Sequence, residues 1–156
     1  DHTVAEFVTD KSGQTGEKVE IAYYARIEAS YISTYVHFNG KLGTLIGFNA
    51  EVGEEVGKNV AMQAATMAPI AISKDDCPAD IVEKERQIGR EQARLDGKPE
   101  AMLDKIAEGK LNKFFAESTL LGQALIDDNK ITVDAYIKKA NPSATVVAYK
   151  RFSLND

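Results

Sequence analysis

The sequence predicts an α+β fold, in which an antiparallel sheet packs on helices and a helical hairpin is inserted late in the chain. Apolar and polar residues alternate over 18–48, as in strands, and apolar residues recur every three to four positions over 54–67, as in a helix. A highly charged stretch with a thin apolar seam follows at 78–117. We therefore expect a three-stranded meander, a C-terminal strand that joins it, and an antiparallel two-helix coiled-coil arm at 78–117.

The composition fits one domain over residues 1–156, with the arm as an appendage. A net charge of -5 argues against binding to nucleic acid or to a membrane surface, because both need a basic face. The single cysteine, Cys77, cannot form an intramolecular disulfide, and no apolar run approaches the roughly 20 residues of a membrane span. These features indicate a cytoplasmic protein. Since the chain begins at Asp1 rather than Met, we expect it to be part of a longer one.

The first expected elements are a short helix and the meander. Thr3 and Glu6 form a capping-box pattern, which predicts a helix that continues to Gly13 and Gly16. Alternation then predicts strands at 18–28, 31–38 and 42–48. Asn39-Gly40 between the last two is a strong hairpin signal, because both central positions of a type I′ turn need positive φ.

The next expected element is an amphipathic helix from Glu54 to Met67, which ends before Pro69. The arm should then consist of two helices joined by a tight turn at Gly97-Lys98-Pro99. Its narrow apolar seam can pair one helix with another but cannot form the wall of a globular core. The seam consists of Ile81, Ile88, Leu95, Leu103, Ala107, Leu111 and Phe114. Such an arm is suited to contacting a partner.

Two elements should close the chain. Thr132 is expected to cap a short helix that ends near Asn141-Pro142, and Thr145 to Leu154 should form the last strand.

No arrangement in the sequence indicates catalysis. The glycines lack the Lys-Ser/Thr of a phosphate loop, the acidic pairs lie in polar runs, and two histidines, His2 and His37, are too few for a metal site. We therefore expect no catalytic residue, no metal and no cofactor. A hydrolase that uses His37 with a strand carboxylate such as Glu28 is the weakest alternative, since no nucleophile with a partnered base is evident.

The second strand offers one candidate contact surface. We expect its residues Ile32, Val36 and Phe38 to face the core. The opposite face would then carry Tyr31, Ser33, Tyr35 and His37. Tyrosine and histidine beside a hairpin turn are typical of an interface, and the alternative is a polar face that lies against the chain's own loops.

Leu125-Ile126 is a second candidate, in the loop between the arm and the last helix. Apolar pairs in such loops usually pack into their own core, and a minority form exposed contact points.

Taken together, several motifs resemble the second half of the bacterial elongation factor Ts family, the nucleotide exchange factors of the GTPase elongation factor Tu. The motifs are Val82-Glu83-Lys84-Glu85, Gly97-Lys98-Pro99, Ile106-Ala107-Glu108-Gly109-Lys110, Lys113-Phe114, and Glu117, Leu120 and Gly122-Gln123. The resemblance continues through Val60-Ala61-Met62-Gln63-Ala64-Ala65, Tyr35-Val36-His37 and Thr132-Val133, so it covers nearly the whole chain.

The resemblance implies a core of two related halves, with the arm inserted in the second half. In the family this second half docks on the third domain of elongation factor Tu. A strand histidine and an apolar pair after the arm contribute to that contact, and they correspond here to His37, with Tyr35 beside it, and to Leu125-Ile126. The implied work is anchoring, with no covalent chemistry and no direct binding of the nucleotide.

This chain also departs from the family. The family's Thr-Asp-Phe-Val run, which loosens the nucleotide's magnesium site, has no counterpart, because Phe7-Val8-Thr9-Asp10 differs in order and place. Gln63 stands where some members have a histidine. The chain should therefore bind weakly and exchange poorly by itself. A different class of function stays open, a structural module that self-associates into a homo-oligomer through its tyrosine face and arm.

Overall fold

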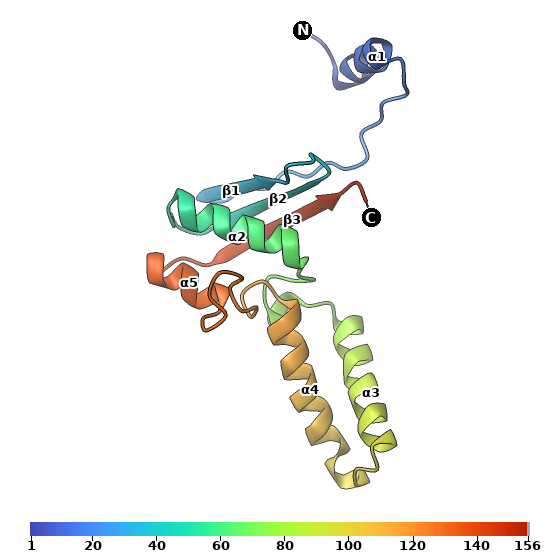
Figure 1. Ribbon diagram of the computed structural model, residues 1–156, viewed down its shortest axis with the longest axis vertical. Helices are drawn as coiled ribbons and strands as arrows, with labels where there is room; N and C mark the ends of the chain where they lie inside the picture. Colours follow the sequence, from blue (N-terminus) through green and yellow to red (C-terminus); the bar gives the residue numbers. More distant parts are fainter. Residues whose placement is uncertain (156) are drawn as a thin grey trace.

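The computed structural model describes residues 1–155, and it confirms the α+β class (Figure 1). The elements are α1 (Val4–Thr15), β1 (Tyr31–Val36), β2 (Leu42–Phe48), α2 (Glu54–Met67), a 3₁₀ turn η1 (Lys74–Asp76), α3 (Ala79–Leu95), a 3₁₀ turn η2 (Glu100–Met102), α4 (Leu103–Ser118), α5 (Val133–Ala140) and β3 (Val146–Ser153). Figure 1 shows α1 at one end of the molecule and the α3–α4 pair at the other, with the sheet between them.

The sheet is three-stranded and antiparallel, in the order β1-β2-β3. β1 and β2 form the predicted hairpin, in which Tyr31 lies opposite Phe48 and Val36 opposite Gly43. Gly40 in the turn has φ of 68°, a conformation that glycine adopts without strain. Asn39 does not have positive φ, and the Gly40 N–H donates to the His37 carbonyl, so Phe38 and Asn39 are the central residues of the turn. The type I′ turn predicted at Asn39-Gly40 is therefore wrong, although the hairpin is confirmed. The last strand of the chain pairs with β2, so the predicted addition of the C-terminal strand to the hairpin is also confirmed.

The strand predicted at 18–28 is wrong. In the described structure this segment is extended but pairs with no strand, and it leads from α1 to β1 across the sheet face that lies opposite α2. Tyr23 stacks on Phe152 with ring centroids 5.1 Å apart, and Ile27 and Ala29 lie against Gly47. The alternation therefore reflects side chains that lie alternately toward the sheet and toward solvent. It carries no information on whether a hydrogen-bonding partner exists.

The core lies between the sheet and the helices α2 and α5. Ile46 and Phe48 of β2 are fully buried against Val60 of α2 and Ile137 of α5, in one apolar cluster. The buried hydroxyl of Thr44 donates a hydrogen bond to the Ala61 carbonyl of α2 at 2.7 Å.

The close docking of α2 depends on a glycine. A Cβ on Gly57 would lie 1.9 Å from the Ser33 hydroxyl of β1, so only glycine fits in the present position. The contact shows that Ser33 lies on the face of β1 that α2 covers.

The helix ends follow the predicted signals. Thr3 and Glu6 form the capping box of α1, and the Thr132 hydroxyl accepts a hydrogen bond from the Ala135 N–H at the start of α5. Gly16 ends α1 in the left-handed conformation with φ of 71°.

The α3–α4 pair occupies the predicted arm, but its contact face differs from the expected seam. Leu103, Ala107 and Leu111 of α4 are buried as expected. On α3 the buried residues are Gly89 and Ala93, while the predicted seam residue Leu95 is 87% exposed. Small residues let the helices approach closely, so the larger apolar side chains of α3 are not needed between them.

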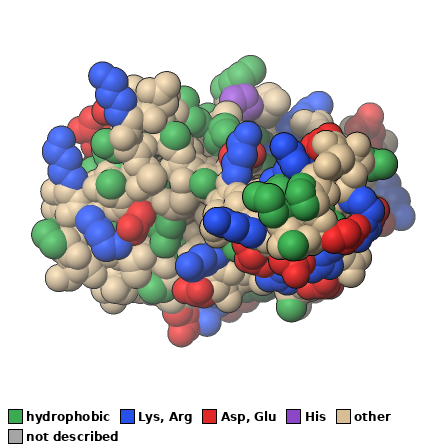
Figure 2. Space-filling view, turned by 90° about the horizontal axis from the view of Figure 1, so that it is seen from below, with side chains coloured by type: hydrophobic (Ala, Val, Ile, Leu, Met, Phe, Trp, Pro, Cys, Tyr) green, Lys and Arg blue, Asp and Glu red, His purple; other side chains and the backbone are tan. Residues whose placement is uncertain are grey.

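Ion pairs flank this contact. Arg86 pairs with Glu108 at 2.7 Å, Arg90 with Asp104 at 2.7 Å and Arg94 with Glu100 at 3.0 Å, each pair joining α3 to α4 or to the turn before it. In Figure 2, which looks along the molecule from below, basic and acidic side chains are interleaved. Exposed pairs of this kind stabilise little individually.

The base of the α3–α4 pair is attached to the body by backbone hydrogen bonds. Ile70 N–H donates to the Ser118 carbonyl, and the Leu120 and Leu121 N–H groups donate to the carbonyls of Ala71 and Ile72.

Within residues 1–155 no helix has both the length and the apolar character needed to cross a bilayer.

Candidate functional site

The first two candidate residues, Tyr35 and His37, lie at the end of β1 and just after it, and the faces of β1 are the reverse of those predicted. Tyr31 and Tyr35 pack against the core cluster, whereas Ile32 and Val36 are exposed on the other face of the sheet. Alternation shows which residues share a face, but β1 carries bulky side chains on both faces. The side that α2 covers is decided by tertiary packing.

His37 lies just beyond β1, at the start of the hairpin turn. Its backbone N–H donates to the Leu42 carbonyl at 2.8 Å, and its Nδ1 shares a hydrogen bond of 2.9 Å with the Tyr35 hydroxyl. The ring of Phe38, which is 93% exposed, lies 4.5 Å from the imidazole. Tyr35 therefore supports a half-buried histidine from the core side, and Phe38 extends the same turn into solvent.

Leu125 and Ile126 have different environments although they are neighbours. Leu125 is 7% exposed and belongs to the core cluster, while Ile126 is 51% exposed. The loop is closed by a hydrogen bond of 2.9 Å from Leu125 N–H to the Ile131 carbonyl. Of this pair, Ile126 is the residue that a partner could contact, and Leu125 anchors it.

The two candidate places are connected through the core. Tyr35, which contacts His37, packs against the core cluster, and Leu125, the neighbour of Ile126, belongs to that cluster. The structure gives no direct contact between His37 and Ile126.

In the sequence, Gln63 of α2 is only a departure from the family. The structure places its side chain, 1% exposed, in contact with the loop that carries Ile126. The signal that could have identified it is its position: a polar residue three positions after Val60, on the apolar face of an amphipathic helix.

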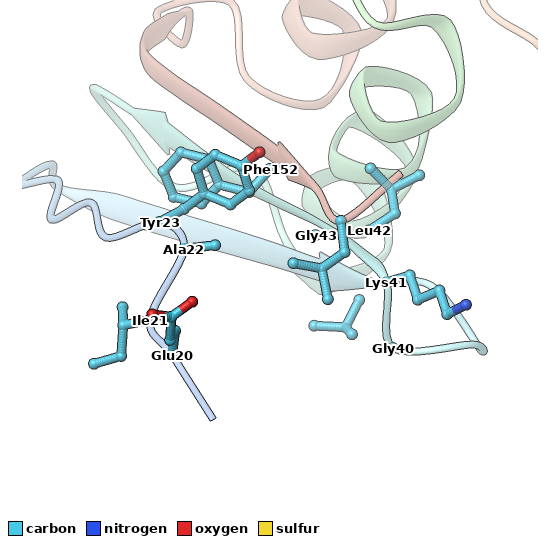
Figure 3. A pocket seen from close by; sticks show the side chains of 11 residues that line it. Glu20, Ile21, Ala22, Tyr23, Gly40, Lys41, Leu42, Gly43 and Phe152 are labelled. Carbon is cyan, nitrogen blue, oxygen red and sulfur yellow. The ribbon is translucent and has the colours of Figure 1, made fainter. Parts of the chain in front are cut away.

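A shallow groove of about 360 Å³ lies on the sheet face opposite α2. Figure 3 shows the stacked rings of Tyr23 and Phe152 at one side of it and Lys41 at the hairpin on the other. Its lining is mainly apolar, and the charged residues are Glu20 and Lys41. An exposed and mainly apolar lining of this kind is typical of a contact surface.

The titratable groups with shifted pKa values lie outside these places. Burial raises the pKa of the Cys77 thiol, and the nearby carboxylates Asp76 and Asp80 raise it further, so the thiolate is disfavoured. Burial also raises the pKa of Tyr149 to about 12. Among the described residues no group of three or more His, Cys, Asp or Glu side chains could hold a metal ion.

Comparison with known proteins gives a consistent result. A family model described as Elongation factor TS matches residues 1–156. Elongation factor Ts of Azobacteroides pseudotrichonymphae is 45% identical over 153 residues, which cover 97% of this chain and 56% of that protein. The corresponding protein of Cytophaga hutchinsonii is 45% identical over 156 residues, with 98% and 56% covered, and that of Porphyromonas gingivalis is 40% identical over 153 residues. The chain thus spans little more than half the length of these relatives, and it belongs to the elongation factor Ts family.

Proposed function

We propose that this chain is the anchoring part of a guanine-nucleotide exchange factor for elongation factor Tu, which acts in translation in the cytoplasm. The observation that supports this proposal most strongly is the family match over residues 1–156. Because the chain spans 56% of its relatives' length, the complete exchange activity is assigned to the longer protein.

The proposed mechanism is thermodynamic linkage and includes no covalent step. An exchange factor binds the nucleotide-free GTPase more tightly than the GDP-bound form, so factor and nucleotide weaken each other's binding by the same factor. A contact on a part of the GTPase far from the nucleotide contributes free energy of binding and orients the rest of the factor. The anchoring part therefore needs no catalytic residue, cofactor or nucleotide site of its own.

The proposed contact residues are His37 and Ile126, with Tyr35 and Leu125 as their buried supports. Each contact side chain is held by an internal interaction before any partner arrives: His37 by the Tyr35 hydroxyl, and Ile126 by the loop anchored at Leu125. Side chains ordered in advance lose less conformational entropy on binding, which favours affinity.

Calorimetric titration of the chain into nucleotide-free elongation factor Tu tests the proposal. The chain should bind with one-to-one stoichiometry, and Ile126→Ala should weaken the binding. An equal affinity for both variants, or no binding by the unaltered chain at tens of micromolar, contradicts the assignment.

The sheet face opposite α2 favours a second candidate, self-association into a homo-oligomer. Ile32 and Val36 of β1 are exposed there, beside Leu45 and Phe152. A second copy could cover this apolar face with its own sheet. Sedimentation velocity at micromolar concentration distinguishes the two, because a dimer that dissociates on Val36→Asp supports self-association and a concentration-independent monomer contradicts it.

A further inference from the structure

The side chain of Gln63 is a polar group on the buried face of α2. It is 1% exposed, among the fully buried residues of the molecule. An amide can be buried to this degree without a large penalty only if protein hydrogen bonds replace those it made to water.

The hydrogen bonds of this amide all go to one short segment. Its Nε2 donates to the Ala124 carbonyl at 2.9 Å and to Gln123 Oε1 at 3.3 Å, and its Oε1 accepts from the Ile126 N–H at 2.9 Å. The first and third bonds bracket Leu125, so the backbone on either side of Leu125 is attached to α2. The third bond, from the Ile126 N–H to Gln63 Oε1, fixes the orientation of the Ile126 backbone.

The neighbouring amide extends this arrangement to the end of α4. Gln123 is 2% exposed, and its Nε2 donates to the Glu117 carbonyl at 3.1 Å. Two buried amides therefore connect three parts of the chain: α2, the loop that carries Ile126, and the last turn of α4.

The segment's backbone hydrogen bonds have a different effect. Gln123 N–H donates to the Thr119 carbonyl and Val133 N–H to the Gln123 carbonyl, while Leu125 N–H donates to the Ile131 carbonyl. These bonds attach the segment after α4, before α5 and within the loop, and none of them reaches α2. The buried side chain of Leu125 contacts the core, but apolar contact is not directional. Gln63 therefore supplies the directional attachment.

We infer that Gln63 is a positioning residue, which holds the 123–126 segment on α2 so that Ile126 is presented in one orientation to the partner. The partner side of this inference depends on the proposed function, whereas the positioning of Ile126 can be tested on the chain alone.

The first test is amide hydrogen exchange, followed by NMR on the unaltered chain and on Gln63→Met. Methionine has a similar length and retains apolar packing but has no amide. In the unaltered chain the Ile126 N–H should be protected although its residue is half exposed. In Gln63→Met its exchange should be faster by about tenfold or more, as expected when a buried hydrogen bond is lost. The amides of the β2–β3 ladder should keep their protection.

Gln92→Met provides the matched control, because Gln92 is an exposed glutamine of α3. It should leave the exchange rate of Ile126 unchanged. An unprotected Ile126 N–H in the unaltered chain overturns the inference without any variant, so the test survives if Gln63→Met fails to fold. An unchanged rate in a folded Gln63→Met protein also overturns it.

The second test is a double-mutant cycle on binding to elongation factor Tu, with Gln63→Met and Ile126→Ala. If Gln63 acts through Ile126, the loss caused by Ile126→Ala should be at least several-fold smaller when Gln63 is already replaced. If the fold-losses of affinity caused by the two substitutions simply multiply in the double variant, the positioning role is contradicted. If the unaltered chain fails to bind, the proposed function fails, and the exchange measurement alone decides the positioning of Ile126.

Discussion

Gly89 of α3 lies directly against Ala107 of α4, so closely that a Cβ on Gly89 would be 3.3 Å from the Ala107 Cα. This contact, rather than a ladder of large apolar side chains, brings the two helices together. A Cβ on Gly89 would also lie 3.6 Å from the Cβ of Lys110 in α4. The absence of a side chain at position 89 therefore determines how closely the helices can approach.

Gly89→Leu should separate α3 from α4 and lower the stability of the chain by about 1–3 kcal/mol, because a large side chain has no room at the contact. The control is Gly109→Ala in α4, where an added Cβ meets nothing within 4 Å. That change should raise stability by about 0.5–1 kcal/mol through helix propensity. Thermal melting followed by circular dichroism at 222 nm measures both, and a Gly89→Leu protein as stable as the control would contradict the contact.

Deleting residues 81–117 and joining the ends with a short linker tests whether the α3–α4 pair is a separate unit. We expect the sheet to remain folded, because the core cluster contains no residue of α3 or α4. Circular dichroism should show loss of helix with a cooperative melting transition retained. Complete unfolding of the deletion variant would show instead that this pair is part of the core.

Asp76 should make the chain sensitive to acid. Burial alone would raise the pKa of this carboxyl, but hydrogen bonds from the N–H groups of Ser73 and Ile72 outweigh it, and the pKa lies below its ordinary value of 3.8. A carboxylate with a lowered pKa in the folded state stabilises the protein above its unfolded pKa. This contribution is present at neutral pH and is lost as the pH falls below about 3.8.

Asp76→Asn should therefore cost less than about 1 kcal/mol at pH 7, because solvent screens this exposed carboxylate, and the difference from the unaltered chain should disappear below the lowered pKa. Asp75→Asn removes the same charge without removing these hydrogen bonds and should have little effect. Urea unfolding at several pH values measures all three proteins. A pH-independent difference would show that the Asp76 carboxylate is not the stabilising group.

His37→Ala should weaken binding to elongation factor Tu by about 1–2 kcal/mol, a typical loss for an interface anchor. The melting temperature should change little, because His37 lies at the turn and outside the core cluster. Tyr24→Ala is a suitable control, since Tyr24 is an exposed aromatic residue outside the hairpin. Unchanged affinity, or unfolding of the His37 variant, would contradict the anchor assignment.

The elements that local pattern defines were predictable from the sequence. The β1–β2 hairpin, α2 and the capped α5 all depend on residues close together in the chain, although the type I′ geometry expected at Asn39-Gly40 is not adopted. The strand predicted at 18–28 failed because alternation indicates an extended chain with two faces, whereas a strand also needs a neighbour to pair with. A local sequence pattern does not show whether a second strand lies beside the segment in the fold.

The candidate site was only partly predictable for the same reason. Tyr35 and His37 were identified by residue type, but their side of the sheet depends on the fit between Ser33 and Gly57 on α2. The hydrogen bond between Gln63 and Ile126 joins residues 63 positions apart, so only the fold brings them together. Leu95 belongs to the apolar seam that the sequence predicts, but the close contact at Gly89 makes large side chains on α3 unnecessary there.

The proposed role of this chain is to hold the partner GTPase as one part of an exchange factor. The most direct test is to immobilise this chain and measure how much purified elongation factor Tu it retains. The measurement is made with the nucleotide-free GTPase and again with saturating GDP. Linkage predicts measurable retention of the GTPase without nucleotide and less retention when GDP is added. Equal retention in the two conditions, or none in either, would contradict the account.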